Sequence, residues 1–230
     1  MQLPVICALV SVGLNAALIF AHPTAHDRST NTQLACGQGG SYFDPRVNGG
    51  SMLDASGGLG EPLNVIISGQ SSPDVLDATG KFYNYANAIG FSYECLGFHI
   101  GDPQQANLGD GRGWAVIRQD YGNSVFGTCE ESVIGGNHFR IYPQLGTCAL
   151  FLAVSIEEKA STNHNIEPNG YDAGRDALVA GAIGERQFDG VKYTTTAQTI
   201  EGLLPVGTQG INHNIAIDGK VILLTVTIHN

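Results

Sequence analysis

The chain has 230 residues, of which 43% are hydrophobic and only 14% are charged, and its formal net charge at pH 7 is −10. An acidic surface is repelled by polyanions, so this charge disfavours nucleic acids and anionic membrane surfaces as partners. About two hundred residues, the length left after removal of an N-terminal leader, suit one domain with its own core.

The first segment has the pattern of a leader. Residues 3–20 are almost entirely apolar, carry no acidic residue and are followed by the small residue Ala21. We therefore predict a signal peptide over residues 1–21, cleavage at or near His22, and a secreted, extracellular protein. No later segment is long and apolar enough to span a bilayer, so we predict no membrane association after cleavage. The oligomeric state is not predicted.

Cys7 would leave with the signal peptide, and four cysteines would remain: Cys36, Cys95, Cys129 and Cys148. In an extracellular chain such a set indicates disulfides, and three pairings are possible. We favour Cys95–Cys129, because this bridge would close the glycine-rich excursion between them, which leaves Cys36–Cys148.

The next elements follow from local patterns. Residues 22–60 are polar and rich in glycine, and we interpret them as a mobile arm followed by a loop-rich cover. Residues 63–68 form a β-branched apolar run that predicts a buried strand. A helix is predicted from Ser72 as N-cap to Gly90, with Pro73 at its first position.

The central stretch alternates in polarity. After a strand predicted over residues 114–119, residues 135–142 place Phe139 and Ile141 on one strand face and His138, Arg140 and Tyr142 on the other. The following run, residues 149–156, is apolar on both faces, as expected of an internal strand. The polar face of the preceding strand would then be covered, and its polar groups would need partners.

A helix beginning near Tyr171 is the predicted partner of that face. Asn169 is its expected N-cap, with Asp172 completing a variant of the capping box. On a helical wheel Arg175 shares the inward stripe with Tyr171 and Leu178, flanked by Asp172 and Asp176. Strands are predicted beyond it over residues 191–199 and 221–228, the second of them central in the sheet.

These elements predict an α+β fold for residues 61–230: a mixed, largely antiparallel central sheet with two main helices packed on it, stabilised by disulfides. They also predict one polar cluster between the central strand and the last helix. Its expected ligand-binding residues are His138, Arg140, Tyr142, His164, Tyr171, Asp172, Arg175 and Asp176.

Two interpretations of this cluster remain open. Guanidinium and imidazole groups suit an anionic small molecule, with hydrolysis of an ester or phosphoester as the reaction class and His138, His164 and Asp176 as catalytic candidates. A metal held by the two histidines and Asp172 or Asp176 lacks tight ligand spacing, so no metal and no cofactor are predicted. Alternatively, the cluster is a structural ion-pair network in a non-catalytic secreted interaction protein.

Three blocks of the sequence resemble a known family. They are the apolar strand after Glu61-Pro62, the block from Gly135 to Tyr142 with its His-x-Arg pattern, and the element from His164 to Asp176. Their order over about residues 61–185 is similar to that of the LssY C-terminal-like domain, as found in uncharacterised secreted fungal proteins. The resemblance implies the arrangement of strands and helix but no particular reaction. The family also has bacterial members, and this chain differs from them in its predicted leader and its cysteines.

Overall fold

The computed structural model describes residues 39–55, 59–97, 104–110 and 115–229, and these belong to one compact unit. The predicted signal peptide, the arm that follows it, Cys36 and Trp114 lie outside the described residues. Within the described part of the chain, no helix is long and apolar enough to cross a membrane.

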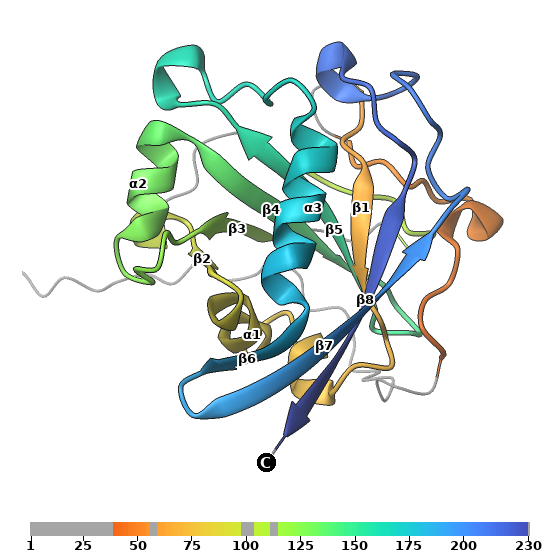
Figure 1. Ribbon diagram of the computed structural model, residues 1–230. Helices are drawn as coiled ribbons and strands as arrows, with labels where there is room; N and C mark the ends of the chain where they lie inside the picture. The colour runs from red at the N-terminus through yellow and green to blue at the C-terminus, as the bar shows by residue number, and fades with distance from the viewer. Residues whose placement is uncertain (1–38, 56–58, 98–103, 111–114, 230) are drawn as a thin grey trace, which may run out of the picture. The chain divides into compact units, whose positions relative to one another are not determined.

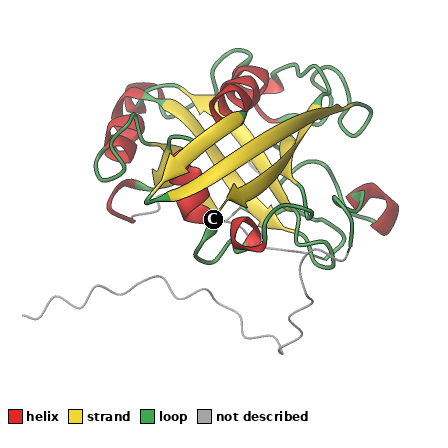
Figure 2. Cartoon of the chain, turned by 60° about the horizontal axis from the view of Figure 1, so that its bottom comes forward, coloured by secondary structure: helices red, strands yellow, loops and turns green. Residues whose placement is uncertain are grey.

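A single eight-stranded sheet organises the unit (Figure 1). Its strand order is β2-β3-β4-β5-β1-β8-β7-β6, and every neighbouring pair is antiparallel except the parallel pair β1–β8. Seen from below, the strands cross one another at steep angles, so the sheet is strongly curled (Figure 2). The strands are β1 Leu63–Ile67, β2 Phe91–Tyr93, β3 Ala115–Gln119, β4 Gly136–Pro143, β5 Leu150–Glu157, β6 Gly184–Phe188, β7 Val191–Ile200 and β8 Val221–His229.

Three α-helices accompany the sheet in the described residues: α1 Phe82–Ala88, α2 Gly127–Ile134 and α3 Gly170–Ala182. The mixed composition and the largely antiparallel sheet agree with the predicted fold class. The sequence prediction missed α2, because its hydrophobic residues are not segregated to one face. It also missed the edge strands β2 and β6, which are only three and five residues long.

The helix predicted from Ser72 to Gly90 is divided in two. A 3-10 turn spans Pro73–Leu76, and α1 begins only at Phe82. The Ser72 hydroxyl accepts a hydrogen bond from the Ile228 N–H of β8 instead of capping the helix. The carboxylate of Asp77 accepts from the N–H and hydroxyl of Thr79, a local turn that competes with helical hydrogen bonding.

The sheet has an apolar cluster on each face. The first cluster joins α1 to the strands through Phe82, Tyr85, Phe139, Ile141 and Leu152. The second is covered by the irregular segments before β1 and between β7 and β8. It includes Met52, Tyr142, Phe151, Tyr171, Leu203 and Ile217. Phe139 and Ile141 therefore lie on the face opposite to Tyr142, as the alternation predicted.

Helix α3 links the two clusters, because Tyr171 at its start packs in the second and Leu178 and Ala182 near its end pack in the first. It approaches β5 very closely at Gly174. A Cβ atom at this position would lie 2.9 Å from the Cα and carbonyl carbon of Ser155. The side chain of Asn64 fastens the same junction, donating to the carbonyls of Val154 and Tyr171.

Asn169 is the N-cap residue of α3, as predicted, but the predicted capping box is absent. Asn169 has a left-handed backbone (φ 65°), and its side chain makes no capping hydrogen bond. Asp172 does not face back to the cap, because its carboxylate accepts from the Asp218 N–H and from Arg175. A tertiary contact has thus replaced the local one.

The Cys95–Cys129 disulfide is present, which confirms one predicted pair, and it ties the segment after β2 to α2. Cys148 is disulfide-bonded as well. Its predicted partner Cys36 lies outside the described residues, so that pairing stays a prediction.

The close approach at Gly174 can be tested within one helix. Gly174→Ala should lower the free energy of unfolding by roughly 1–2 kcal/mol, since overpacking against rigid backbone outweighs the gain in helix propensity. Gly181→Ala is the matched control, because its Cβ would meet only Ile89 O at an ordinary 3.6 Å. It should gain about 0.5–1 kcal/mol. Urea unfolding measures both, and equal effects would contradict the packing argument.

Candidate functional site

The polar face of β4 is buried, as the alternation predicted. His138 is 0% exposed and Arg140 is 7% exposed, and Tyr142 is fully covered. Arg175 on α3, at 2%, is buried too. The structure therefore encloses three of the predicted cationic or titratable groups, and each needs partners that offset the loss of water.

The prediction that these groups form one cluster is wrong. Among the described residues they divide into three clusters, named here after their central members. The His138 cluster comprises Glu94, Arg118, Glu131, His138, Glu157 and His164. The Arg140 cluster comprises Asp54, Glu61, Arg140 and Tyr142, and the Arg175 cluster comprises Asp172, Arg175, Asp176, Asp218 and Lys220. Arg175 does not pair with any residue of β4. Its guanidinium pairs instead with Asp218, in the loop before β8.

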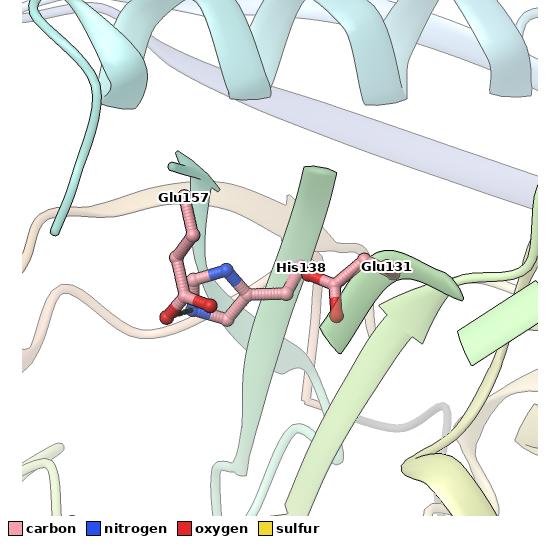
Figure 3. Close-up of side chains that lie close together, drawn as sticks. All are labelled: Glu131, His138 and Glu157. Atoms are coloured by element: carbon pink, nitrogen blue, oxygen red, sulfur yellow. Dashed lines mark ion pairs between the residues drawn. The ribbon is translucent and has the colours of Figure 1, made fainter. Parts of the chain in front are cut away.

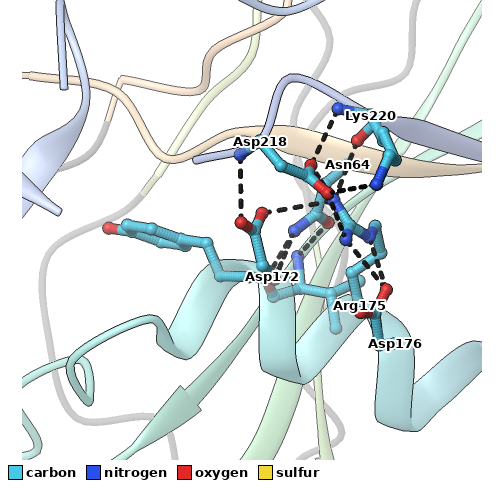
Figure 4. Close-up of polar contacts among 8 residues, drawn as sticks. Asn64, Asp172, Arg175, Asp176, Asp218 and Lys220 are labelled. Atoms are coloured by element: carbon cyan, nitrogen blue, oxygen red, sulfur yellow. Dashed lines mark hydrogen bonds and ion pairs between the residues drawn. The ribbon is translucent and has the colours of Figure 1, made fainter. Parts of the chain in front are cut away.

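In the Arg175 cluster the guanidinium is surrounded by carboxylates (Figure 4). Nη1 and Nη2 donate to both oxygens of Asp218 at 2.6 and 3.1 Å, and Nε donates to Asp176 at 2.9 Å. Nη1 also donates to Asp172 Oδ1 and to the Lys220 carbonyl, each at 3.2 Å. No nitrogen of the fork is left for a ligand.

The electrostatics of this cluster differ between its acids. Burial alone would raise the pKa of Asp218, but hydrogen bonds from Arg175 and Lys220 outweigh it and lower that pKa to about 2. Burial raises the pKa of Asp172, with Arg175 opposing the shift and Asp218 adding to it. The ion pair with Asp218 therefore holds α3 to the loop before β8.

The Arg140 cluster joins β4 to the segment that precedes β1. Arg140 Nε lies 3.1 Å from Asp54 Oδ2, and Arg140 Nη2 contacts Glu61 Oε2. The Tyr142 hydroxyl donates to the same Asp54 oxygen at 3.0 Å. Asp54 and Glu61 are themselves buried, so these ion pairs lie in the interior, beside the second apolar cluster.

Tyr171 points towards this network without joining it. Burial and the charge of Asp54 raise the pKa of its phenol above the ordinary value. Its hydroxyl is buried and has no hydrogen-bond partner in the described residues. Burial, followed by Asp54, likewise raises the pKa of Tyr142, so both phenols stay protonated at any physiological pH.

The His138 cluster is assembled from three strands and a helix. Arg118 of β3 lies beside His138 of β4 in the sheet register, and Glu157 ends β5. Glu131 approaches from α2 (Figure 3). Arg118 Nη1 donates to Glu131 Oε2 at 2.9 Å and to Glu157 Oε2 at 3.0 Å, and Arg118 Nε lies 3.6 Å from Glu94 Oε1.

The imidazole is poorly satisfied within this cluster. His138 Nε2 lies 3.4 Å from Glu157 Oε1, but neither ring nitrogen makes a hydrogen bond in the described residues. Burial lowers the pKa of His138 although Glu157 opposes the shift, so the ring is neutral at pH 7. Burial, with Glu157 adding to it against Arg118, raises the pKa of Glu131 to about 7.

His164 lies at the exposed side of the same cluster. Its Nδ1 is 3.5 Å from Glu157 Oε2, and its side chain is about one third exposed. Two of the predicted catalytic candidates, His138 and His164, are thus brought to one carboxylate. The third, Asp176, belongs to the Arg175 cluster and is mostly exposed.

Sequence analysis missed the acids that hold the cationic groups: Asp54, Glu61, Glu131, Glu157 and Asp218. Asp54 and Asp218 lie in irregular segments, and Glu131 lies in the unpredicted α2. Glu157 directly follows the predicted strand over residues 149–156. An acidic residue at the end of an otherwise apolar strand is the one feature of the sequence that could have indicated a partner for His138. A pocket beside Phe91, Gln119 and Asn137 contains none of the predicted site residues.

Comparison of the chain with models of protein families, with curated proteins and with solved structures finds no match. The resemblance to the LssY C-terminal-like domain therefore stays an expectation, and function has to be argued from the geometry.

The two arginine clusters should differ in how much stability they supply. Arg140→Met would remove the guanidinium that pairs with the carboxylates of Asp54 and Glu61, whose side chains are 0% and 5% exposed, at a cost of roughly 3–5 kcal/mol. Arg175→Met should cost less, because Asp218 and Asp176 are 30% and 67% exposed and water can solvate them. Chemical denaturation of both variants decides, and a larger loss for Arg175→Met would refute this order.

Acid should weaken the Arg175 cluster in a defined pH window. The folded-state pKa of Asp218, about 2, lies below the ordinary value of about 3.9. Its contribution is therefore complete above about pH 4 and is lost as the pH falls towards 2. Asp218→Asn should be less stable than the wild type at pH 7, and the difference should shrink between pH 4 and 2. A difference that stays constant across this window would show that Asp218 does not titrate as proposed.

Proposed function

We propose that this chain is a secreted, non-catalytic protein that binds a protein partner through an apolar surface formed by α2 and the segment linked to it by the Cys95–Cys129 disulfide. The α2 surface, as it is called here, consists of Tyr93, Leu96, Val125, Phe126, Val133 and Ile134. The Arg140 and Arg175 clusters act as structural ion-pair networks that hold the fold.

The observation that carries the proposal is the exposure of this surface. All six side chains are at least half exposed, with Leu96 at 68% and Val125 at 64%. They account for six of the thirteen large hydrophobic residues that are exposed in the described part of the chain. Scattered exposed hydrophobic residues are ordinary, but a concentration on one short helix and its neighbour is typical of an interaction site.

The charge of the chain selects the class of partner. A net charge of −10 disfavours nucleic acid and anionic lipid, both of which need a basic face. An apolar surface that includes an exposed aromatic residue, Phe126, suits a protein, because aromatic anchors contribute much of the binding energy in protein interfaces. The disulfide beneath this surface is also compatible with an extracellular location.

An anionic small ligand is less well supported. It would need a guanidinium with free donors, yet Arg140 pairs with two carboxylates and Arg175 with three. A ligand would have to displace carboxylates that are covalently part of the chain and already in place. These ion pairs therefore favour the structural interpretation of the two clusters.

Hydrolysis is also less well supported, because the hydroxyl of Ser155, the residue paired with His138 in the sheet, is enclosed. Ser155 lies opposite His138 in the β4–β5 register, and both are 0% exposed. The Ser155 hydroxyl makes no hydrogen bond to the imidazole, and α3 packs directly on its backbone at Gly174. A nucleophile needs contact with its base and access to the substrate, and Ser155 has neither.

The proposal predicts site-specific cross-linking from the α2 surface. A photoreactive amino acid at position 126 should capture a partner from the extracellular fluid in which the protein accumulates. The same group at Val206 is the matched control, because Val206 is 77% exposed but lies outside the α2 surface. The captured protein should then bind the purified chain, and Phe126→Ser with Val133→Ser should weaken its Kd at least tenfold, by about 1.4 kcal/mol or more.

Three results would contradict the proposal. Equal capture from both positions would show that the α2 surface is not special. An adduct formed only with a second copy of the chain would replace the partner by self-association, which sedimentation of the purified protein would verify. Ester or phosphoester turnover that disappears in Glu157→Gln would favour the catalytic interpretation.

A further inference from the structure

Unsatisfied polar atoms gather in one part of the structure. Eight buried side-chain nitrogen or oxygen atoms lack a hydrogen bond in the described residues, and six of them belong to Asn137, His138, Ser155, His164 and Tyr171. These residues lie on β4, on β5 and at or before the start of α3. Folded proteins leave few such atoms, because each one costs desolvation energy without compensation. Three of the eight atoms, both ring nitrogens of His138 and Nδ1 of His164, belong to residues that lie beside Glu157, and this concentration requires a cause.

The geometry of the His138 cluster supplies one. One donor atom each from Glu131, His138 and Glu157 lie within 4.8 Å of one another (Figure 3). Each zinc bond to nitrogen or oxygen measures about 2.0–2.2 Å, so three donors on one ion lie about 3.4–3.6 Å apart in tetrahedral or trigonal geometry. Side-chain adjustments of about 1 Å would therefore bring all three to bonding distance.

We propose that Glu131, His138 and Glu157 form a binding site for a divalent transition-metal ion of the Zn²⁺ class. The carboxylates alone would not justify this, since acidic clusters are common. The decisive residue is His138, which is fully buried, faces Glu157 at 3.4 Å and has no hydrogen-bond partner on either nitrogen in the described residues. A ring nitrogen offered together with carboxylates suits Zn²⁺ and its neighbours rather than Ca²⁺ or Mg²⁺, which prefer oxygen ligands.

Arg118 supplies the positive charge of the cluster in the present structure. Its Nη1 contacts both Glu131 and Glu157, so a metal ion bound by these carboxylates has to displace the guanidinium. Arg118 has an alternative position close by, because its Nε is already 3.6 Å from Glu94 and its side chain is 16% exposed. A divalent cation bound by Glu131 and Glu157 would take over the charge compensation that Arg118 now supplies to both carboxylates.

His164 marks the side from which an ion would enter. It is the exposed neighbour of Glu157, and its Nδ1 lacks a hydrogen bond in the described residues. His164 Nδ1 lies 3.5 Å from Glu157 Oε2, beside the three proposed ligands and not among them. The ligands come from positions 131, 138 and 157, a spacing that no short metal motif reproduces.

Zn²⁺ itself is the probe for the test. The purified full-length mature chain is treated with a chelator, dialysed and titrated with ZnCl₂ in a calorimeter, while circular dichroism monitors folding. We expect one ion per chain and a rise in Tm with Zn²⁺ concentration. His138→Asn should weaken binding at least about 100-fold, more than the loss of an outer-shell contact. His213→Asn is the matched control at an exposed histidine and should bind like the wild type.

Arg118→Met separates the metal site from a purely structural network. Removal of the competing guanidinium should tighten Zn²⁺ binding at least about tenfold, or make folding depend on Zn²⁺. A structural network predicts instead a loss of stability that Zn²⁺ does not restore. If His138→Asn fails to fold, Glu157→Gln serves in its place.

Two outcomes would overturn the proposal. The first is less than about one ion in ten chains for both the wild type and Arg118→Met. The second is stoichiometric binding that persists in His138→Asn or Glu157→Gln, which would place the ion elsewhere. Neither outcome depends on the partner proposed for the α2 surface, so the two proposals can fail separately.

Discussion

The neutralisation of buried arginines is the constraint on which the arrangement of this fold depends. A guanidinium taken out of water is tolerated only where carboxylates surround it. Here the carboxylates of the Arg140 and Arg175 clusters come largely from irregular segments: Asp54 and Glu61 before β1, and Asp218 before β8. The same segments cover the second apolar cluster. The buried arginines of β4 and α3 therefore determine where the segments before β1 and β8 lie, because those segments supply the carboxylates.

This arrangement couples elements that are not neighbours in sequence. The Asp54–Arg140 contact joins residues 86 positions apart, and the Arg175–Asp218 contact joins residues 43 positions apart. Asn64 makes similar long-range contacts with an uncharged side chain. Its amide donates hydrogen bonds to the carbonyls of Val154 and Tyr171, which lie 90 and 107 positions away. Polar side chains thus specify how loops, strands and α3 meet, while the apolar clusters supply most of the driving force.

How much of this could be predicted depended on whether the signal was local. The alternation of β4 predicted its two faces, and the inward stripe of α3 predicted the burial of Arg175, because both follow from the geometry of a single element. The partners could not be predicted in the same way. Asp218 replaced His138 and Arg140 as the neighbour of Arg175, and nothing within a short window links Asp218 to α3. Ser72, which accepts from the Ile228 N–H, and Asp172, which accepts from the Asp218 N–H, show that tertiary contacts also override local capping rules.

The three clusters are not chemically equivalent, and the difference lies in what each leaves unsatisfied. In the Arg175 cluster every nitrogen of the guanidinium contacts a carboxylate, and in the Arg140 cluster the guanidinium pairs with two buried carboxylates. In the His138 cluster, by contrast, the enclosed imidazole makes no hydrogen bond within the described residues. A buried polar group without a partner reduces stability, and a protein keeps such a group where another species completes it. The Arg140 and Arg175 clusters are therefore best understood as scaffolding, and the His138 cluster as the place in this fold where binding chemistry should be sought.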